Sequence, residues 1–256
     1  MTRGRASDLA HGRYRIGDGS FSFAAAHRIS SLPAAHKAAR RHGHTFTVDV
    51  ELTDAELQAP GFVADFADLA PVGDYLKREL DHRDLDTLFT FDTTTDALAQ
   101  HITAWFLAHM PPDCGKQLHA VHVAIGASPR AQQADEASFT FEAAHHLNGL
   151  PNGHKCGRDH GHSYRVDLHL APRTDLRRRT RLCALLAAYL DQCIDHRDLN
   201  GVLDFPPTSE LLAEYLYACL VDRAGARDAA SVHAVRVWES PRRWAEFSQD
   251  ERIGQC

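Results

Sequence analysis

The chain has 256 residues, of which 44% are hydrophobic and 24% are charged, and its net charge is −6. No block of like charge indicates a nucleic-acid partner, and no apolar stretch approaches the roughly 20 residues of a membrane span. The N-terminus lacks the apolar run of a signal peptide, so we expect a cytoplasmic protein with neither nucleic-acid nor membrane partners.

In each half, the sequence predicts the order strand, loop, strand, helix, helix, strand. We expect residues 1–15 to be loosely ordered, and Thr45–Leu52 alternates between apolar and polar residues like a half-buried strand. Asp65 or Asp68 can cap a helix that runs toward Leu80. Helical spacing of apolar residues follows at 98–106, and residues 119–125 close the half as a strand.

The second half repeats this order of elements. The expected segments are a strand at 163–170, a helix at 181–194, a helix at 209–220 and a strand at 231–239. Antiparallel strands beside two consecutive helices predict an α+β domain with the helices on one face of the sheet. An open sheet of this kind leaves unpaired edges, and assembly into a ring would cover them.

Matching motifs show that the halves are copies of one another. Phe21-Ser-Phe-Ala-Ala-Ala-His27 returns as Phe139-Thr-Phe-Glu-Ala-Ala-His145, 118 positions later (145 − 27). Asp81-His82-Arg83 returns as Asp195-His196-Arg197, 114 positions later (195 − 81). A deletion of four residues explains the change of offset.

The sequence therefore predicts a tandem duplication. We expect a first domain at residues 16–130 and a second at 135–250, with the boundary in the polar segment 128–136.

Three histidines recur in both copies. Positions i and i+2 of a strand point to the same side, so each His-Gly-His motif aims two imidazoles together, and the neighbouring strand can supply a third. Three histidines with an open fourth position are typical of a catalytic zinc site. We predict zinc in the second copy and structural zinc in the first, on these residues: His145, His160 and His162; His27, His42 and His44.

Further reactive groups occur in the second copy. Cys156, four residues before His160, is a fourth zinc ligand, a packing thiol, or a nucleophile or base. Asp195-His196 is either an acid–base pair or a helix-end cap with a salt bridge. Glu239 ends an apolar strand and is either a pocket carboxylate or a surface group at a strand end.

Residues 139–164, including the Cys-x-x-x-His-Gly-His spacing at 156–162, resemble the 6-pyruvoyltetrahydropterin synthase superfamily, and most closely its 6-carboxytetrahydropterin synthases. The likeness continues through 195–200, 207–210 and 235–239, and it extends weakly over the first half. The resemblance implies two tandem tunnelling-fold (T-fold) domains, each with a four-stranded antiparallel sheet and two helices on one face. It also implies a homo-oligomer with pterin sites between units, for which we prefer a homotrimer.

The resemblance also implies residue roles. Its zinc histidines match the second-copy histidines, its catalytic groups match Cys156, Asp195 and His196, and its pterin-anchoring glutamate matches Glu239. The implied reaction converts 7,8-dihydroneopterin triphosphate to 6-carboxy-5,6,7,8-tetrahydropterin, which would feed 7-deazapurine pathways such as queuosine. Alternatives are 6-pyruvoyltetrahydropterin synthesis, action on a modified pterin, and a zinc-bound pterin-binding pseudoenzyme.

The copies differ where this chemistry would occur. At the repeat offsets, Ala38 replaces Cys156 and Ile125 replaces Glu239 in the first copy. We therefore expect a degenerate first copy and a catalytic second copy. The first copy keeps Asp81-His82, which we expect to reach the site of a neighbouring unit, as the pair does in the family.

Overall fold

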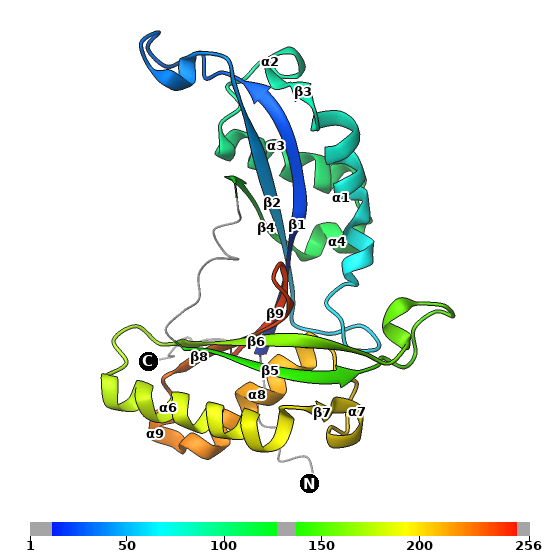
Figure 1. The fold of residues 1–256 in the computed structure, drawn as a ribbon, viewed down its shortest axis with the longest axis vertical. Helices are drawn as coiled ribbons and strands as arrows, with labels where there is room; N and C mark the ends of the chain where they lie inside the picture. Colours follow the sequence, from blue (N-terminus) through cyan, green and yellow to red (C-terminus); the bar gives the residue numbers. More distant parts are fainter. Residues whose placement is uncertain (1–11, 127–136, 250–256) are drawn as a thin grey trace. The chain divides into compact units, whose positions relative to one another are not determined.

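The computed structural model describes residues 12–126 and 137–249 (Figure 1). These residues form two compact units. The first-copy unit contains the described residues of 17–52 and 64–126, and the second-copy unit contains those of 12–16, 53–63 and 137–249. No helix of the described residues is both long and apolar enough to cross a membrane.

The first-copy unit is built on three long strands in the order β4-β2-β1. Alternate residues of β2, from Phe46 to Leu52, are fully buried, while the core side of α3 contains Leu98, Ile102 and Phe106. The period of two in the strand and of about four in the helix gives each element one apolar side. The strands are β1 (Gly12–His27), β2 (His42–Asp54) and β4 (Leu118–Ile125), with β3 (Arg83–Asp84) parallel to β1.

Helical segments of 3 to 15 residues connect these strands. Asp65 caps the first of those that follow β2, because its side chain accepts a hydrogen bond from the backbone N–H of Ala67 at 2.8 Å. This confirms one of the two expected caps. The segments are η2 (Lys37–Ala39), η3 (Phe66–Leu69), α1 (Ala70–Tyr75), η4 (Leu76–Leu80), α2 (Leu85–Leu88), α3 (Thr95–His109) and α4 (Pro112–Gln117).

The second-copy unit has its long strands in the order β9-β8-β6-β5, each antiparallel to the next. Tyr164, Val166 and Leu168 of β6 belong to the same hydrophobic core as buried residues of α6 and α8. The strands are β5 (Ser138–His145), β6 (His160–Leu170), β8 (Val232–Ser240) and β9 (Arg243–Gln249), with β7 (Arg197–Asp198) parallel to β5.

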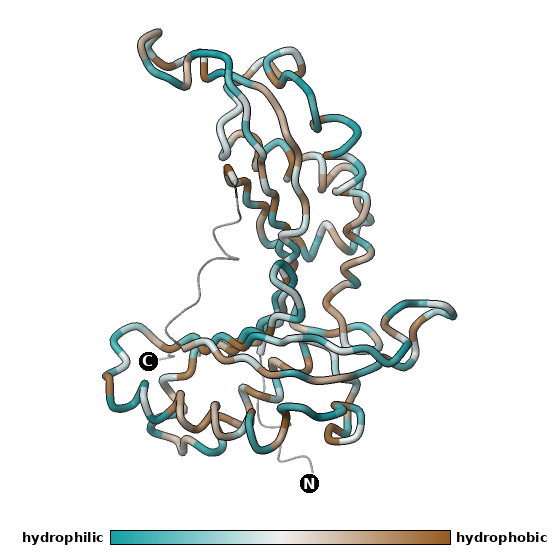
Figure 2. The backbone as a smooth tube through the Cα atoms, in the orientation of Figure 1, coloured by the Kyte–Doolittle hydropathy of each residue, from teal (hydrophilic) through white to brown (hydrophobic). Residues whose placement is uncertain are grey.

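The helices of this unit lie on one side of its sheet (Figure 1), and the tube in Figure 2 alternates between hydrophobic and hydrophilic along them. Helix α6 begins at Leu176, before the predicted start at Arg181, because the Asp175 side chain accepts a hydrogen bond from Arg178 N at 2.9 Å. The helical segments are η5 (Lys155–Gly157), α6 (Leu176–Tyr189), η6 (Leu190–Ile194), α7 (Leu199–Val202), α8 (Ser209–Ala224) and α9 (Ala226–Ala229).

Two segments of the first copy pack inside the second-copy unit. Residues 12–15, which we expected to be loosely ordered, instead form the start of β1, and this end of β1 is the neighbour of β9. The Tyr14 ring packs against Phe247, with 5.2 Å between ring centroids. For residues 12–15 the expectation was wrong, because the tertiary partner in β9 lies far away in the sequence; residues 1–11 lie outside the described residues.

The second segment follows β2. The Gly61 carbonyl accepts a hydrogen bond from Thr208 Oγ1 at 2.9 Å, and Val63 N donates one to Glu210 Oε1 at 3.1 Å. Gly61 has φ of 138°, and a Cβ there would lie 2.5 Å from Leu211 Cδ1. The positive φ favours glycine at this position, because other residues rarely adopt that backbone conformation.

The predicted boundary segment 128–136 lies outside the described residues. The domain boundaries 16–130 and 135–250 stay a prediction, since compact units and sequence repeats need not coincide.

Candidate functional site

Three histidines of the second-copy unit converge at the meeting of β5 and β6. His145 ends β5 and pairs with His160, the first residue of β6, while His162 lies two residues further along β6. Their ring centroids are 4.5, 5.2 and 5.0 Å apart, and one nitrogen of each lies within 4.8 Å of the others. The predicted cluster is therefore present as a group that could hold a metal ion.

Backbone carbonyl groups orient the three rings. His145 Nδ1 donates to the Pro207 carbonyl at 2.9 Å, His160 Nδ1 donates to the Arg158 carbonyl at 2.7 Å, and His162 hydrogen-bonds to the backbone of Glu239. A carbonyl partner fixes the proton on Nδ1 and leaves Nε2 as the ligand atom of His145 and His160. His145 Nε2 is buried without a hydrogen-bond partner among the described residues, as expected for a metal-binding nitrogen.

The protonation states also fit metal binding. Burial lowers the pKa of His145 to about 4, and burial lowers the pKa of His162 as well. Neutral imidazole is the form that binds metals. An all-nitrogen set suits a transition metal better than calcium or magnesium, which prefer oxygen ligands.

Cys156 lies in the short turn η5, just before β6. Its carbonyl accepts a hydrogen bond from Leu147 N at 2.8 Å, which ties the turn to the segment after β5. Cys156 is half-buried and forms no disulfide bond with another cysteine of the described residues. Within the described residues, the metal-binding group comprises the three histidines and does not include Cys156. The role of Cys156 therefore stays a prediction.

Glu239 lies on β8 beside the cluster. Its Oε2 accepts a hydrogen bond from Ser209 Oγ at 3.0 Å, and its backbone hydrogen-bonds to His162. Ser209 is the first residue of α8 and is only 4% exposed. Glu239 is therefore an oriented carboxylate joined to both the helix start and the cluster.

First-copy residues also contact the start of α8. Thr208 and Glu210, on either side of Ser209, hold the segment 61–63 by the two hydrogen bonds described above. The sequence placed residues 207–210 in a shared motif, but it gave no sign that first-copy residues would lie against them.

Tyr164 is a site residue that sequence reasoning missed. Arg165 of β6 pairs with Trp238 of the antiparallel strand β8. Tyr164, the residue before Arg165, therefore lies opposite Glu239, the residue after Trp238. Burial, followed by the charges of Glu239 and Cys156, raises the pKa of the Tyr164 hydroxyl above its ordinary range. A signal was available in the repeat, because Phe46 occupies the matching position of the first copy.

Asp195 and His196 form the expected pair at 2.9 Å, between Oδ2 and Nδ1. Asp195 Oδ1 accepts a hydrogen bond from Glu142 N, which, ahead of the contact with His196, lowers the pKa of the carboxyl group. His196 has φ of 55°, and its side chain is 76% exposed. Among the described residues, the pair makes no hydrogen bond with the cluster of its own unit.

The first-copy unit repeats the cluster with different surroundings. The centroids of His27, His42 and His44 are 4.6, 5.3 and 4.8 Å apart. His27 Nδ1 contacts the Thr93 carbonyl at 3.1 Å and His42 Nδ1 the Arg40 carbonyl at 2.7 Å. His27 Nε2 is again buried without a partner within the described part of the chain. This group, too, could hold a metal ion.

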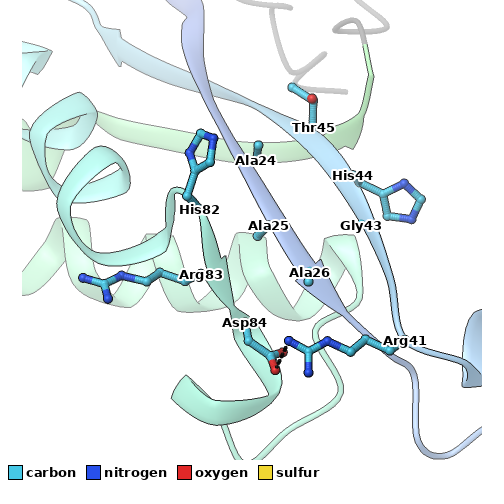
Figure 3. Close-up of a pocket in the computed structure, with 10 residues that line it drawn as sticks. All are labelled: Ala24, Ala25, Ala26, Arg41, Gly43, His44, Thr45, His82, Arg83 and Asp84. Atoms are coloured by element: carbon cyan, nitrogen blue, oxygen red, sulfur yellow. Dashed lines mark ion pairs between the residues drawn. The ribbon is translucent and has the colours of Figure 1, made fainter.

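A pocket of about 570 Å³ opens beside this first cluster (Figure 3). His44 and His82 both line it, and Arg41 forms an ion pair with Asp84 at 2.7 Å. His82 pairs with Asp81 at 2.9 Å, as in the second copy. The carboxylate and thiol are missing, however, because Ile125 and Ala38 occupy their positions.

Comparisons with known proteins point to one family. The model of the family described as "6-pyruvoyl tetrahydropterin synthase" matches residues 18–131 and again residues 136–250. A 6-carboxy-5,6,7,8-tetrahydropterin synthase of Synechocystis sp. is 35% identical over 114 residues, covering 40% of this chain and 82% of that protein. A dihydroneopterin monophosphate aldolase of Pyrococcus furiosus is 36% identical over 72 residues, covering 28% of this chain and 60% of that protein. The solved 6-pyruvoyl tetrahydropterin synthase of Caenorhabditis elegans is 23% identical, covers 42% of this chain and 89% of its own, and has a TM-score of 0.33.

Proposed function

The chain belongs to the 6-pyruvoyl tetrahydropterin synthase family, and we propose that it is a zinc-dependent pterin lyase with one competent site per chain, in the second copy. The proposed substrate is 7,8-dihydroneopterin triphosphate, and the preferred product is 6-carboxy-5,6,7,8-tetrahydropterin. The Cys-x-x-x-His-Gly-His spacing at 156–162 and the Synechocystis relative support this product.

One observation carries the proposal. Glu239 is joined to the histidine cluster through its backbone contact with His162 and to α8 through Ser209 Oγ. A group that could hold a metal ion and an oriented carboxylate thus lie together, and the Cys156 turn directly precedes β6. The first copy has the same cluster without the carboxylate or the thiol, so the combination is specific to the second copy.

The residues have separate roles in this proposal. The Glu239 carboxylate accepts hydrogen bonds from the pterin amino group and the adjacent ring N–H in a bidentate manner. The Cys156 thiolate accepts and returns a proton at the pterin side chain. An Asp-His pair carries protons to and from the oxygen atoms of that side chain. His145, His160 and His162 would hold zinc, which supplies polarisation of the side-chain oxygens when bound.

The Asp-His pair would come from a neighbouring unit. Both Asp195-His196 and Asp81-His82 present an imidazole that is mostly exposed, held by a carboxylate at 2.9 Å. A homotrimer, with two T-fold copies per chain, would supply six units for such shared sites, and it is the assembly that we propose.

Incubation of the purified protein with 7,8-dihydroneopterin triphosphate, followed by mass spectrometry of the pterin products, tests the function. We expect a 6-carboxytetrahydropterin product, formed in proportion to the zinc content. A 6-pyruvoyl product would keep the family chemistry and change the product assignment. Unchanged substrate with zinc-loaded protein would contradict the proposal and favour a pterin-binding pseudoenzyme.

A second reaction is favoured by one relative. The Pyrococcus furiosus protein is named a dihydroneopterin monophosphate aldolase, so the same product analysis should include 7,8-dihydroneopterin monophosphate. Faster turnover of the monophosphate than of the triphosphate would assign aldol cleavage to this site instead.

A further inference from the structure

The second-copy site contains a buried hydroxyl group that the roles above do not use. Tyr164 is 1% exposed, and its hydroxyl has no hydrogen-bond partner among the described residues. A buried polar group without a partner destabilises the folded state, so its presence calls for a reason.

Packing does not supply that reason. The Tyr164 ring stacks on Phe141 with 4.7 Å between centroids, and Phe46 of the first copy stacks on Phe23 at 5.0 Å. Both rings also meet the second histidine of the His-Gly-His motif edge-on, at 5.4 Å and 5.7 Å respectively. Phenylalanine therefore fulfils the same packing role in the first copy without a hydroxyl group.

The hydroxyl group instead occurs in the same copy as the carboxylate. In the first copy, Phe46 pairs across the strands with Ile125. The corresponding positions of the second copy are Tyr164 and Glu239, which face the same side of the sheet because they are cross-strand neighbours. Both positions are apolar in one copy and polar in the other.

We propose that Tyr164 contacts the substrate directly, with its hydroxyl donating a hydrogen bond to a ring acceptor of the bound pterin. This inference rests on the proposed function. Tyr164 lies between the two ends of the site, because Glu239 is its cross-strand neighbour and the His162 ring meets the Tyr164 ring edge-on at 5.4 Å. A pterin bound with its amino edge on Glu239 and its side chain toward the histidines would then lie across Tyr164.

The chemistry of the ring completes the argument. A carbonyl oxygen stands next to the ring N–H that Glu239 would bind, and this oxygen accepts hydrogen bonds only. Glu239 is itself an acceptor and cannot satisfy it. The phenolic O–H of Tyr164, on the adjacent strand, is a donor that can satisfy it.

Tyr164→Phe tests the proposal, with neopterin as the binding probe in equilibrium dialysis. We expect the Kd for neopterin to rise by about tenfold, the loss expected for one buried hydrogen bond. Zinc content should be unchanged, and the melting temperature should stay equal or rise, because phenylalanine removes an unpartnered polar group. Phe46→Tyr is the matched control, and it should leave neopterin binding and turnover unchanged.

Several outcomes would overturn the inference. Equal neopterin affinity in Tyr164→Phe and the wild-type protein would show that the hydroxyl does not touch the pterin. Unchanged neopterin affinity with a reduced kcat would indicate that the hydroxyl group acts on Cys156 instead. Loss of zinc would indicate that it supports the histidine cluster. A zinc-loaded wild-type protein that neither binds neopterin nor converts dihydroneopterin triphosphate would remove the proposed function and this inference together.

Discussion

The two histidine clusters of this chain are nearly the same shape, but their surroundings differ. Centroid distances agree within 0.2 Å from pair to pair (4.6 and 4.5, 5.3 and 5.2, 4.8 and 5.0 Å). Around the second cluster stand a thiol, a carboxylate and a phenol, on Cys156, Glu239 and Tyr164. The first copy has a hydrocarbon side chain at each of these positions.

This difference separates what the fold maintains from what the chemistry requires. The clusters are positioned by strand pairing and by backbone carbonyl groups, such as those of Arg40 and Arg158. These interactions persist when neighbouring side chains change. Ile125, by contrast, is 52% exposed, and the first copy keeps its fold without a carboxylate at this position. A copy can therefore lose its catalytic groups and still keep a metal-binding group.

The largest effect should come from removing a second-copy ligand. His160→Ala should abolish turnover, because it deletes one of three metal-binding nitrogens beside Glu239. Metal analysis should show nearly two zinc ions per wild-type chain and about one in the variant, as expected from two clusters.

His42→Ala is the matched change in the first copy. It should remove one ion and leave substantial turnover if the first metal is only structural. Freshly purified wild-type protein that contains no zinc, and that zinc does not activate, would contradict both expectations.

Replacement of the thiol should have the next largest effect. Cys156→Ala should lower kcat by about 10²–10⁴-fold, because it removes a proton-transfer group. Zinc content should be kept, since the cluster does not include the thiol. Cys219→Ala, at a packing position of α8, is the control, and zinc loss in Cys156→Ala would instead identify a fourth ligand.

The next test asks which copy completes the site. First-copy segments 12–16 and 53–63 pack in the second-copy unit, so we expect a first-copy neighbour to supply the pair. His82→Ala should then lower kcat by about 10²-fold, and His196→Ala should have little effect. The reverse result would indicate rings of like copies.

The same protein should be a homotrimer in sedimentation. A monomer with full activity would rule out sites shared between chains.

The sequence predicted much of this arrangement because the relevant signals are local. Strand alternation in β2 and β6 and the spacing of the His-Gly-His motifs are visible within a few residues. The offsets of 118 and 114 then located Ala38 and Ile125 without a structure. Family membership and the two histidine clusters followed from such patterns.

What could not be predicted depends on contacts between distant segments. The hydrogen bond from Val63 to Glu210 spans 147 positions and links different copies. The unpartnered state of the Tyr164 hydroxyl depends on every group around it, which no local pattern encodes. The early start of α6 was missed for a smaller reason, since the cap at Asp175 precedes a run of arginines that is typical of a solvated turn and helix start.

The smallest expected effect is a gain in the first copy. In the double variant Phe46→Tyr with Ile125→Glu, the polar pair of the second copy is placed beside the first cluster. Ile125 is exposed enough to accept a charge without burial. We expect equilibrium dialysis to detect a second neopterin per chain, bound about 10- to 100-fold more weakly than the first, because no other group has been adapted to it. Leu88→Glu adds the same charge at another exposed first-copy position and should add no binding. An unchanged stoichiometry in a folded, zinc-loaded double variant would show that the two copies differ in more than these two side chains.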